Sequence, residues 1–119
     1  MDIPGTKTTG DCGEELAAVF LRKRDMEIVE TNYRFGHGEI DIIARDGDVL
    51  VFCEVKTRKS DLFGPPEYAI TLRKQAQVRK IAEAYLYERG ISDQICRFDV
   101  VAIRMKGGKA DLRYYKNAF

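Results

Sequence analysis

Two β-rich runs joined by a short turn constrain this fold more than any other part of the sequence. The runs cover residues 39–45 and 49–57, and Arg45-Asp46-Gly47-Asp48 separates them. An Asp-Gly pair between such runs is a strong signal for a β-hairpin. The same runs hold carboxylates and a lysine among apolar residues, where an unpaired charge is costly. The segment therefore predicts a sheet framework and also the place where chemistry is to be expected.

The rest of the sequence predicts helices and strands around this hairpin. Apolar residues recur at helical spacing after Asp11, a candidate N-cap, and again in a second segment that Gly90 is placed to end. The predicted order is helix, three antiparallel strands, helix and two strands, which is an α/β fold. These elements cover residues 11–24, 27–34, 39–45, 49–57, 71–89, 96–104 and a short run that ends near Tyr115.

Length and composition limit the classes of protein that fit. The chain has 119 residues, which suffices for one core, and we expect a single domain over residues 1–119 with a loose tail at 1–9. Its 20 basic and 19 acidic side chains nearly balance, so any surface for a polyanion must be local. Three widely spaced cysteines argue against a disulfide framework or a zinc site. With neither a signal peptide nor a membrane span in the sequence, we expect a cytoplasmic protein without a membrane partner.

The pleat of the hairpin predicts which side chains lie together. If Asp46 and Gly47 form a two-residue turn, Asp41 faces Phe52 and lies diagonal to Glu54, roughly 7–8 Å away between backbones. One face then carries Glu39, Asp41, Ile43, Phe52, Glu54 and Lys56, and the other points Ile40, Ile42, Val51, Cys53 and Val55 into the main core. Two close carboxylates in apolar surroundings repel each other unless a cation is present.

A hard divalent ion suits the pair formed by Asp41 and Glu54. Magnesium takes oxygen ligands and commonly uses one or two protein carboxylates together with phosphate oxygens of a substrate. Lys56, on the same face, is placed to orient a water or to stabilise charge on a phosphate. Metal-assisted hydrolysis of a phosphodiester needs this combination of a Lewis acid, a nucleophile and a positive group. The alternative is a structural ion-pair network, in which Lys56 would neutralise only one of the two carboxylates.

These residues also carry a resemblance to known proteins. Asp41, Glu54, Val55 and Lys56 form a D-x(12)-E-x-K pattern after an N-terminal helix with a glutamate, which resembles the active-site signature of the PD-(D/E)XK nuclease superfamily. The segments GEELA, NYR, GEIDIIARDGD, VFCEVKTR and RFDVVAI resemble the YraN-like family of small uncharacterised bacterial proteins, related to archaeal Holliday junction resolvases. The similarity covers about residues 10–116.

The resemblance implies a fold, a site and a function. The fold is a restriction-endonuclease-like αβββαβ core with a mixed central sheet flanked by helices. Asp41 and Glu54, with the Val55 backbone carbonyl, would bind Mg²⁺ or Mn²⁺, and Lys56 would be the catalytic lysine. The implied function is a metal-dependent nuclease that acts on DNA, branched DNA included. Because the resolvase relatives act as dimers, a homodimer is among the expected arrangements.

Other candidate residues have two interpretations each. Glu14 matches the helix glutamate of the resolvases and would be a further metal ligand, but it lies three residues after Asp11, the spacing of a capping interaction. Glu39, at the mouth of its strand, is either an outer ligand or a solvated side chain. The single histidine, His37, lies between two glycines and is predicted to be a surface residue. Asp99 is either a ligand or a buried, hydrogen-bonded charge that supports the fold.

Basic residues form local clusters that would follow phosphates beside the site. Arg58 and Lys59 come directly after the strand that carries Lys56, and Lys74 and Gln75 match a Lys-Gln pair of the family. For the basic residues of the second helix, an ordinary solvated surface is the alternative. A different class of function is a nucleic-acid-binding or adaptor protein that keeps the fold without cutting. Such a protein has no need for carboxylates that repel phosphate.

Overall fold

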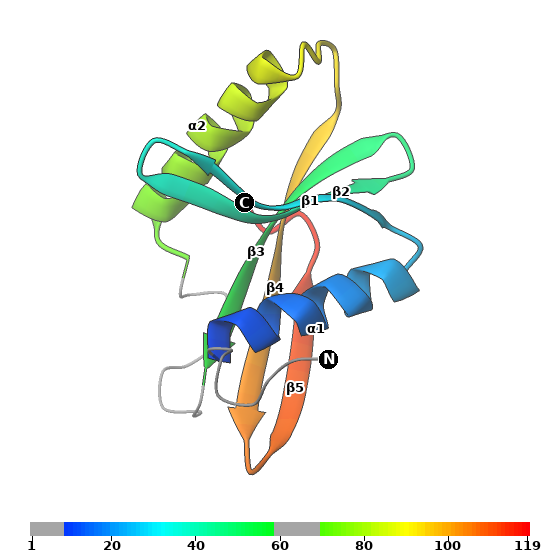
Figure 1. Cartoon of the computed structure of the whole chain (residues 1–119), viewed down its shortest axis with the longest axis vertical. Helices are drawn as coiled ribbons and strands as arrows, with labels where there is room; N and C mark the ends of the chain where they lie inside the picture. The colour runs from blue at the N-terminus through cyan, green and yellow to red at the C-terminus, as the bar shows by residue number, and fades with distance from the viewer. Residues whose placement is uncertain (1–8, 59–69) are drawn as a thin grey trace.

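A five-stranded mixed sheet with one helix on each face makes up the fold (Figure 1). The computed structural model describes residues 9–58 and 70–119, with side chains from residue 12 onward. In chain order the elements are α1 (Thr9–Lys23), β1 (Glu27–Phe35), β2 (Gly38–Asp46), β3 (Val49–Arg58), α2 (Leu72–Glu88), β4 (Cys96–Lys106) and β5 (Lys109–Tyr115). The α/β class, the αβββαβ order and the mixed sheet expected from the sequence are confirmed.

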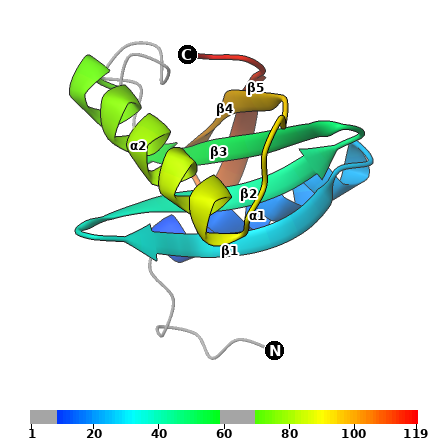
Figure 2. The same ribbon diagram turned by 90° about the horizontal axis from the view of Figure 1, so that it is seen from above.

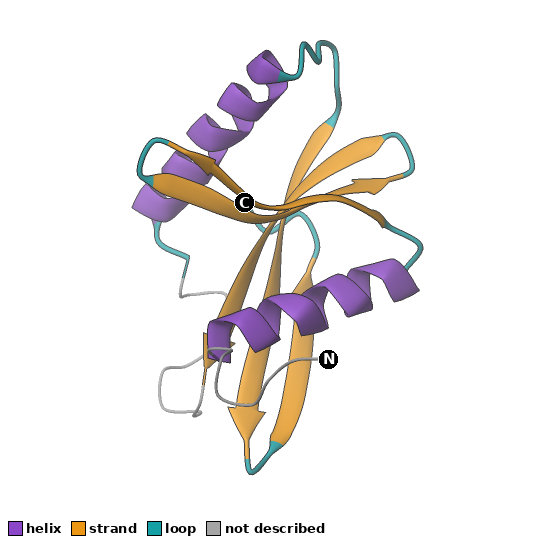
Figure 3. Cartoon of the chain, in the orientation of Figure 1, coloured by secondary structure: helices purple, strands orange, loops and turns teal. Residues whose placement is uncertain are grey.

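The strands lie side by side in the same order as in the chain, from β1 to β5. β3 and β4 run parallel, and all the other neighbours run antiparallel. Parallel neighbours need a crossover connection, and α2 lies in the segment that leads from β3 back to β4 (Figure 3). The sheet is strongly twisted: in Figure 1 the hairpin of β1 and β2 runs across the view, whereas β3, β4 and β5 run along it.

Each helix covers its own apolar cluster, so both faces of the sheet are buried. In the α1-side cluster, Leu21 of α1 packs with Val51 and Cys53 of β3. In the α2-side cluster, Tyr85 of α2 packs with Phe52. Successive residues of β3 therefore enter opposite clusters, as the pleat requires. Figure 2 shows α1 and α2 on opposite sides of the sheet. The sheet face that was predicted to carry the charged residues is therefore also buried, in the α2-side cluster.

The hairpin turn lies one residue later than the sequence analysis placed it. Asp46 pairs with Val49, so the two turn residues are Gly47 and Asp48. Gly47 has a φ of 61°, a left-handed conformation that glycine adopts at no steric cost. The predicted register was therefore wrong by two residues. Because side chains alternate with a period of two, the face assignment along β3 survived this error.

The pleat rule failed in β2 at Ile40. Ile40 packs in the α2-side cluster, whereas Ile42 packs in the α1-side cluster, although both were predicted on one face. Thr31 pairs with Ile42 and Tyr33 with Ile40, which puts Asn32 opposite Asp41. Asn32 has a φ of 51°, outside the range of extended strands. β1 thus departs from extended geometry directly opposite Asp41, next to the point where the alternation of β2 changes.

The helix ends differ from the prediction at α1 and agree with it at α2. α1 begins at Thr9, so Asp11 lies inside the helix and is not its N-cap. Residues 1–8 of the predicted tail lie outside the described residues. Thr71 caps α2 with its side chain, and Gly90, with a φ of 64°, follows the helix as predicted. None of the helices in residues 9–58 and 70–119 is long and apolar enough to cross a membrane.

A buried hydrogen-bond network holds Asp99 of β4. Asp99 is fully buried, and its carboxylate accepts hydrogen bonds from Arg97 Nε at 3.0 Å and from the Asn117 backbone N–H at 2.8 Å. The Tyr114 hydroxyl donates to the same carboxylate. Arg97 also pairs with Asp46 at the end of β2, at 3.0 Å. Because the network ties β4 to β2, β5 and the C-terminal segment, Asp99 has the structural role of its two interpretations.

Removing the charge of Asp99 should therefore destabilise the fold. Asp99→Asn should lower the free energy of unfolding by about 3–5 kcal/mol, because Arg97 would lose its buried carboxylate partner. Urea denaturation measures this change. Asp48→Asn makes the same substitution at an exposed turn position and should stay within about 0.5 kcal/mol of the wild type. Equal stability of the two variants would contradict the structural role.

Candidate metal centre

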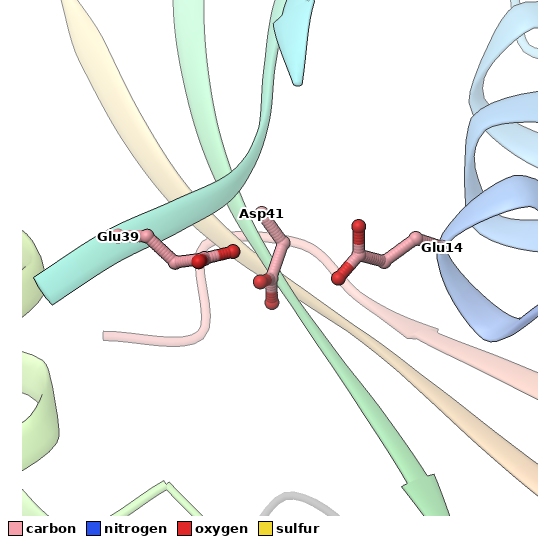
Figure 4. Close-up of side chains that lie close together, drawn as sticks. All are labelled: Glu14, Glu39 and Asp41. Atoms are coloured by element: carbon pink, nitrogen blue, oxygen red, sulfur yellow. The ribbon is translucent and has the colours of Figure 1, made fainter. Parts of the chain in front are cut away.

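Three carboxylates from two elements converge where β2 and β3 separate (Figure 4). Glu14 on α1 and Glu39 and Asp41 on β2 each offer one oxygen, and these oxygens lie within 4.8 Å of one another. Figure 4 shows the three side chains pointing toward a common centre. Ligand oxygens around one hard divalent cation lie up to about 4–5 Å apart, twice a metal–oxygen distance of roughly 2.1–2.5 Å. The spacing therefore fits a single cation.

Asn32 of β1 joins two of these carboxylates. Its side-chain Nδ2 donates to Glu14 Oε1 at 2.8 Å and to Glu39 Oε2 at 3.0 Å, so both N–H groups of the amide are used. Asparagine tolerates the left-handed backbone conformation found here better than most residues do. Sequence reasoning missed Asn32. The available signal was an asparagine inside a strand-like run, where this residue is disfavoured.

Asp41 and Glu54 are linked through the backbone at the point where the strands diverge. The Val55 N–H donates to Asp41 Oδ2 at 2.7 Å, and the Asp41 N–H lies 3.4 Å from Glu54 Oε2. The regular pairs of β2 and β3 end at Ile42 and Cys53, so these bonds replace the next step of the ladder. The N–H and C=O of one strand residue point toward the same neighbour. The Val55 carbonyl therefore faces the same opening as Asp41.

Burial and mutual repulsion disfavour the ionised forms of these carboxyls. Burial raises the pKa of Asp41 to about 6, and the charges of Glu14 and Glu39 act in the same direction. Burial also raises the pKa of Glu54 to about 7, with the charge of Asp41 adding to the effect and Lys74 opposing it. Glu54 is only 2 % exposed. The cluster therefore lacks positive charge, and a bound cation would favour the ionised forms and so oppose both shifts.

Two basic side chains at the edge of the site partly compensate the negative charge of the carboxylates. Lys74 of α2 places its Nζ 3.5 Å from Glu54 Oε1. Arg34 of β1 places its Nε 3.5 Å from Glu39 Oε1. No described residue forms an ion pair with Asp41, the carboxylate that the structure places between these two contacts. An ion-pair network therefore exists at the rim, but it does not include the centre.

The other predicted site residues take different positions. Lys56 lies on β3 two residues beyond Glu54 and is half-buried. Arg58 ends β3, and Lys59 lies outside the described residues. Gln75 of α2 donates a hydrogen bond from its Nε2 to the Ile70 carbonyl at 3.2 Å.

The capping interpretation of Glu14 was wrong, because its predicted partner Asp11 is not the N-cap of α1. The residue before Glu14 explains how α1 comes close enough to present it. A Cβ on Gly13 would lie 2.3 Å from Thr57 Oγ1 of β3, so a larger residue here would require at least the Thr57 side chain to move. Gly13 thus allows α1 to lie close to β3, and from this position the neighbouring Glu14 reaches the carboxylate cluster.

The residues of this centre lie in a region shared with other bacterial proteins. The model of "Uncharacterised protein family UPF0102" matches residues 13–103. A UPF0102 protein of Geotalea daltonii is 46% identical over 114 residues, which cover 95% of this chain and 90% of the relative. One from Syntrophus aciditrophicus is 45% identical over 111 residues, covering 93% and 87%. One from Symbiobacterium thermophilum is 43% identical over 115 residues, covering 96% and 98%.

The raised pKa values predict how stability depends on pH without a divalent cation. The folded state keeps protons on Asp41 and Glu54 up to about pH 6 and 7, whereas their usual pKa values are 3.8 and 4.5. Between these limits the folded state binds more protons than the unfolded state, so stability falls as the pH rises and levels off above about pH 8. From pH 5 to pH 8 the loss should be about 2–4 kcal/mol.

Urea denaturation in the presence of a chelator measures this loss. Glu54→Gln should remove much of it, because the variant has no proton to release at this position. Glu83→Gln, on the exposed side of α2, is the matched control and should keep the wild-type pH dependence. A wild-type stability that stays constant or rises between pH 5 and pH 8 would show that folding does not raise the pKa values of Asp41 and Glu54.

Proposed function

The chain belongs to uncharacterised protein family UPF0102, and we propose that it is a metal-dependent nuclease that hydrolyses phosphodiester bonds in DNA. The observation that carries the proposal is the convergence of Glu14, Glu39 and Asp41 beside the buried Glu54. The D-x(12)-E-x-K pattern and the αβββαβ order, both of which resemble the PD-(D/E)XK nucleases, support the same function.

The donor set suits Mg²⁺ or Mn²⁺. Its side chains offer carboxylate oxygens only, which hard divalent cations prefer over nitrogen or sulfur ligands. Asp41 would be the central ligand, because its carboxylate lies between the α1 side of the site, where Glu14 approaches, and the β3 side, where Glu54 and the Val55 carbonyl lie. A bound cation would supply Lewis-acid polarisation of the phosphate and would lower the pKa of water at the site.

Lys56 is the residue of the chain that we assign to the reacting phosphate. Side chains alternate along β3, so Lys56 lies on the same face as Glu54. The ammonium of this half-buried residue would stabilise the negative charge that develops on the phosphate and would orient the attacking water. Lys74, by contrast, forms an ion pair with Glu54, so it differs from Lys56 in its position and in its partner.

Cleavage of labelled DNA tests the proposal. The purified protein should cut only with Mg²⁺ or Mn²⁺, and Asp41→Ala, Glu54→Ala and Lys56→Ala should each lower the rate by at least about 100-fold. Lys109→Ala, at the distant turn between β4 and β5, is the control and should keep the wild-type rate. Denaturing gels with branched, duplex and single-stranded DNA measure the rate and the substrate preference.

Cutting that survives Glu54→Ala or Lys56→Ala would contradict the assignment of these residues. If the protein binds DNA but neither cuts it nor binds a divalent cation in calorimetry, the chain is an adaptor that keeps the fold without the activity.

Asn32 should position the two glutamates that it joins. Asn32→Gly removes the amide but keeps a residue that adopts the left-handed backbone, so the variant isolates the side chain. We expect Mg²⁺ affinity in calorimetry to fall by about 10–100-fold, the usual effect of losing a group that orients metal ligands. Asn117→Gly is a matched control, because Asn117 is also left-handed, with a φ of 56°, and is exposed. Wild-type Mg²⁺ affinity in Asn32→Gly would exclude the positioning role.

A further inference from the structure

Two basic side chains beside the metal centre are each held by one of its carboxylates. Arg34 pairs with Glu39 and Lys74 pairs with Glu54, and each N–O distance is 3.5 Å. Charge-assisted hydrogen bonds between such groups are usually about 2.7–2.9 Å long, so both contacts are loose. Arg34 comes from β1 and Lys74 from α2, two elements that meet at the opening of the site.

A polar pocket of about 390 Å³ connects the two cations. Its lining includes Arg34, His37, Glu39, Lys74 and Gln77, from the β1–β2 turn and from α2. The lining is therefore rich in hydrogen-bond donors, and Glu39 is the one carboxylate among the described residues that form it.

The pocket continues along the exposed side of α2. A second hollow of about 460 Å³ shares Lys74 and Gln77 with it and adds Arg73 and Lys80. Positive side chains are thus available along a path that starts at the carboxylate cluster and follows the helix. A nucleic-acid backbone, which carries regularly spaced phosphates, suits a basic path of this kind.

We propose that the pocket between Arg34 and Lys74 binds a backbone phosphate of the DNA strand next to the scissile bond, and that it does so only when the metal centre is occupied. The inference rests on the proposed nuclease function and adds a subsite and a binding order to it. With a divalent cation neutralising Glu39 and Glu54, Lys74 loses its buried partner and the exposed Arg34 no longer has a competing carboxylate, so both can bind the phosphate.

The energetic reason lies in the burial of Glu54. In the metal-free site, a phosphate would approach the negative charge of Glu39 and would have to draw Lys74 away from Glu54. That step would leave a carboxylate of 2 % exposure without its cation, which is costly. With the centre occupied, this cost is absent, so metal binding and phosphate binding favour each other. By linkage, each ligand must raise the affinity for the other by the same factor.

The direction of the effect separates this coupling from ordinary salt effects. Divalent cations normally screen phosphates and weaken the binding of DNA to basic surfaces. A gain in affinity on adding Mg²⁺ therefore needs a specific cause, and the release of Arg34 and Lys74 is one that substitutions can isolate.

Fluorescence anisotropy with a short labelled single strand tests the proposal. The titration uses the Lys56→Met background, which prevents cutting, and compares Mg²⁺ with a chelator at constant ionic strength. Mg²⁺ should tighten binding by at least about 5-fold. Arg34→Gln and Lys74→Gln should each remove most of this gain. Lys80→Gln, in the neighbouring hollow, should instead weaken binding by the same factor with and without Mg²⁺.

A double-mutant comparison gives a second readout that needs no metal. Glu39→Gln should raise metal-free DNA affinity, because it releases Arg34 and removes a negative charge from the pocket, and the gain should be smaller when the same substitution is made in the Arg34→Gln protein. If calorimetry shows normal Mg²⁺ binding while DNA affinity stays unchanged or falls on adding Mg²⁺, the coupling is wrong and the nuclease function stands. If calorimetry shows no Mg²⁺ binding, both proposals are overturned.

Discussion

The hydrogen bond from the Val55 N–H to the Asp41 carboxylate is the contact on which the candidate site depends. β2 and β3 stop pairing after Ile42 and Cys53, and a separating strand normally leaves backbone donors without partners. The Asp41 carboxylate accepts a hydrogen bond from the Val55 N–H, so this donor keeps a partner where the strands separate. The same bond fixes the Asp41 carboxylate at the opening, where α1 on one face brings Glu14 to within 4.8 Å of it. Asp41 therefore takes part both in the end of the β2–β3 hydrogen-bond ladder and in the carboxylate cluster.

Two buried carboxylates of neighbouring strands differ in how fully the surrounding groups compensate their charge. Asp99 is surrounded by donors: Arg97, the Tyr114 hydroxyl and the Asn117 N–H all bind it. Among the residues that the structure describes, the partners of the Glu54 carboxylate are the Asp41 N–H at 3.4 Å and Lys74 in a loose ion pair. Burial without full compensation raises its pKa, whereas a fully bonded carboxylate stabilises the fold. This difference in the number and strength of hydrogen bonds to the two carboxylates supports a ligand role for Glu54 and a structural role for Asp99.

Much of this arrangement was predictable from local patterns, and the failures have definite causes. The shared face of Glu54 and Lys56 survived a wrong hairpin register, because the error was two residues and side chains alternate with a period of two. Ile40 was assigned to the wrong face because the alternation along β2 changes between Ile40 and Ile42, opposite the left-handed Asn32. No periodicity rule anticipates a single residue with positive φ inside a strand.

The sequence by itself determined the order of the elements, the hairpin and the D-x(12)-E-x-K pattern of Asp41, Glu54 and Lys56, because these follow from the spacing of residues close together in the chain. Only the tertiary structure decided that Glu14 joins Asp41, and that Lys74 approaches Glu54 from α2. These meetings depend on which face of the sheet each helix covers, how closely it packs and where two strands part. Such properties arise from the packing of distant segments, and local sequence patterns do not contain them.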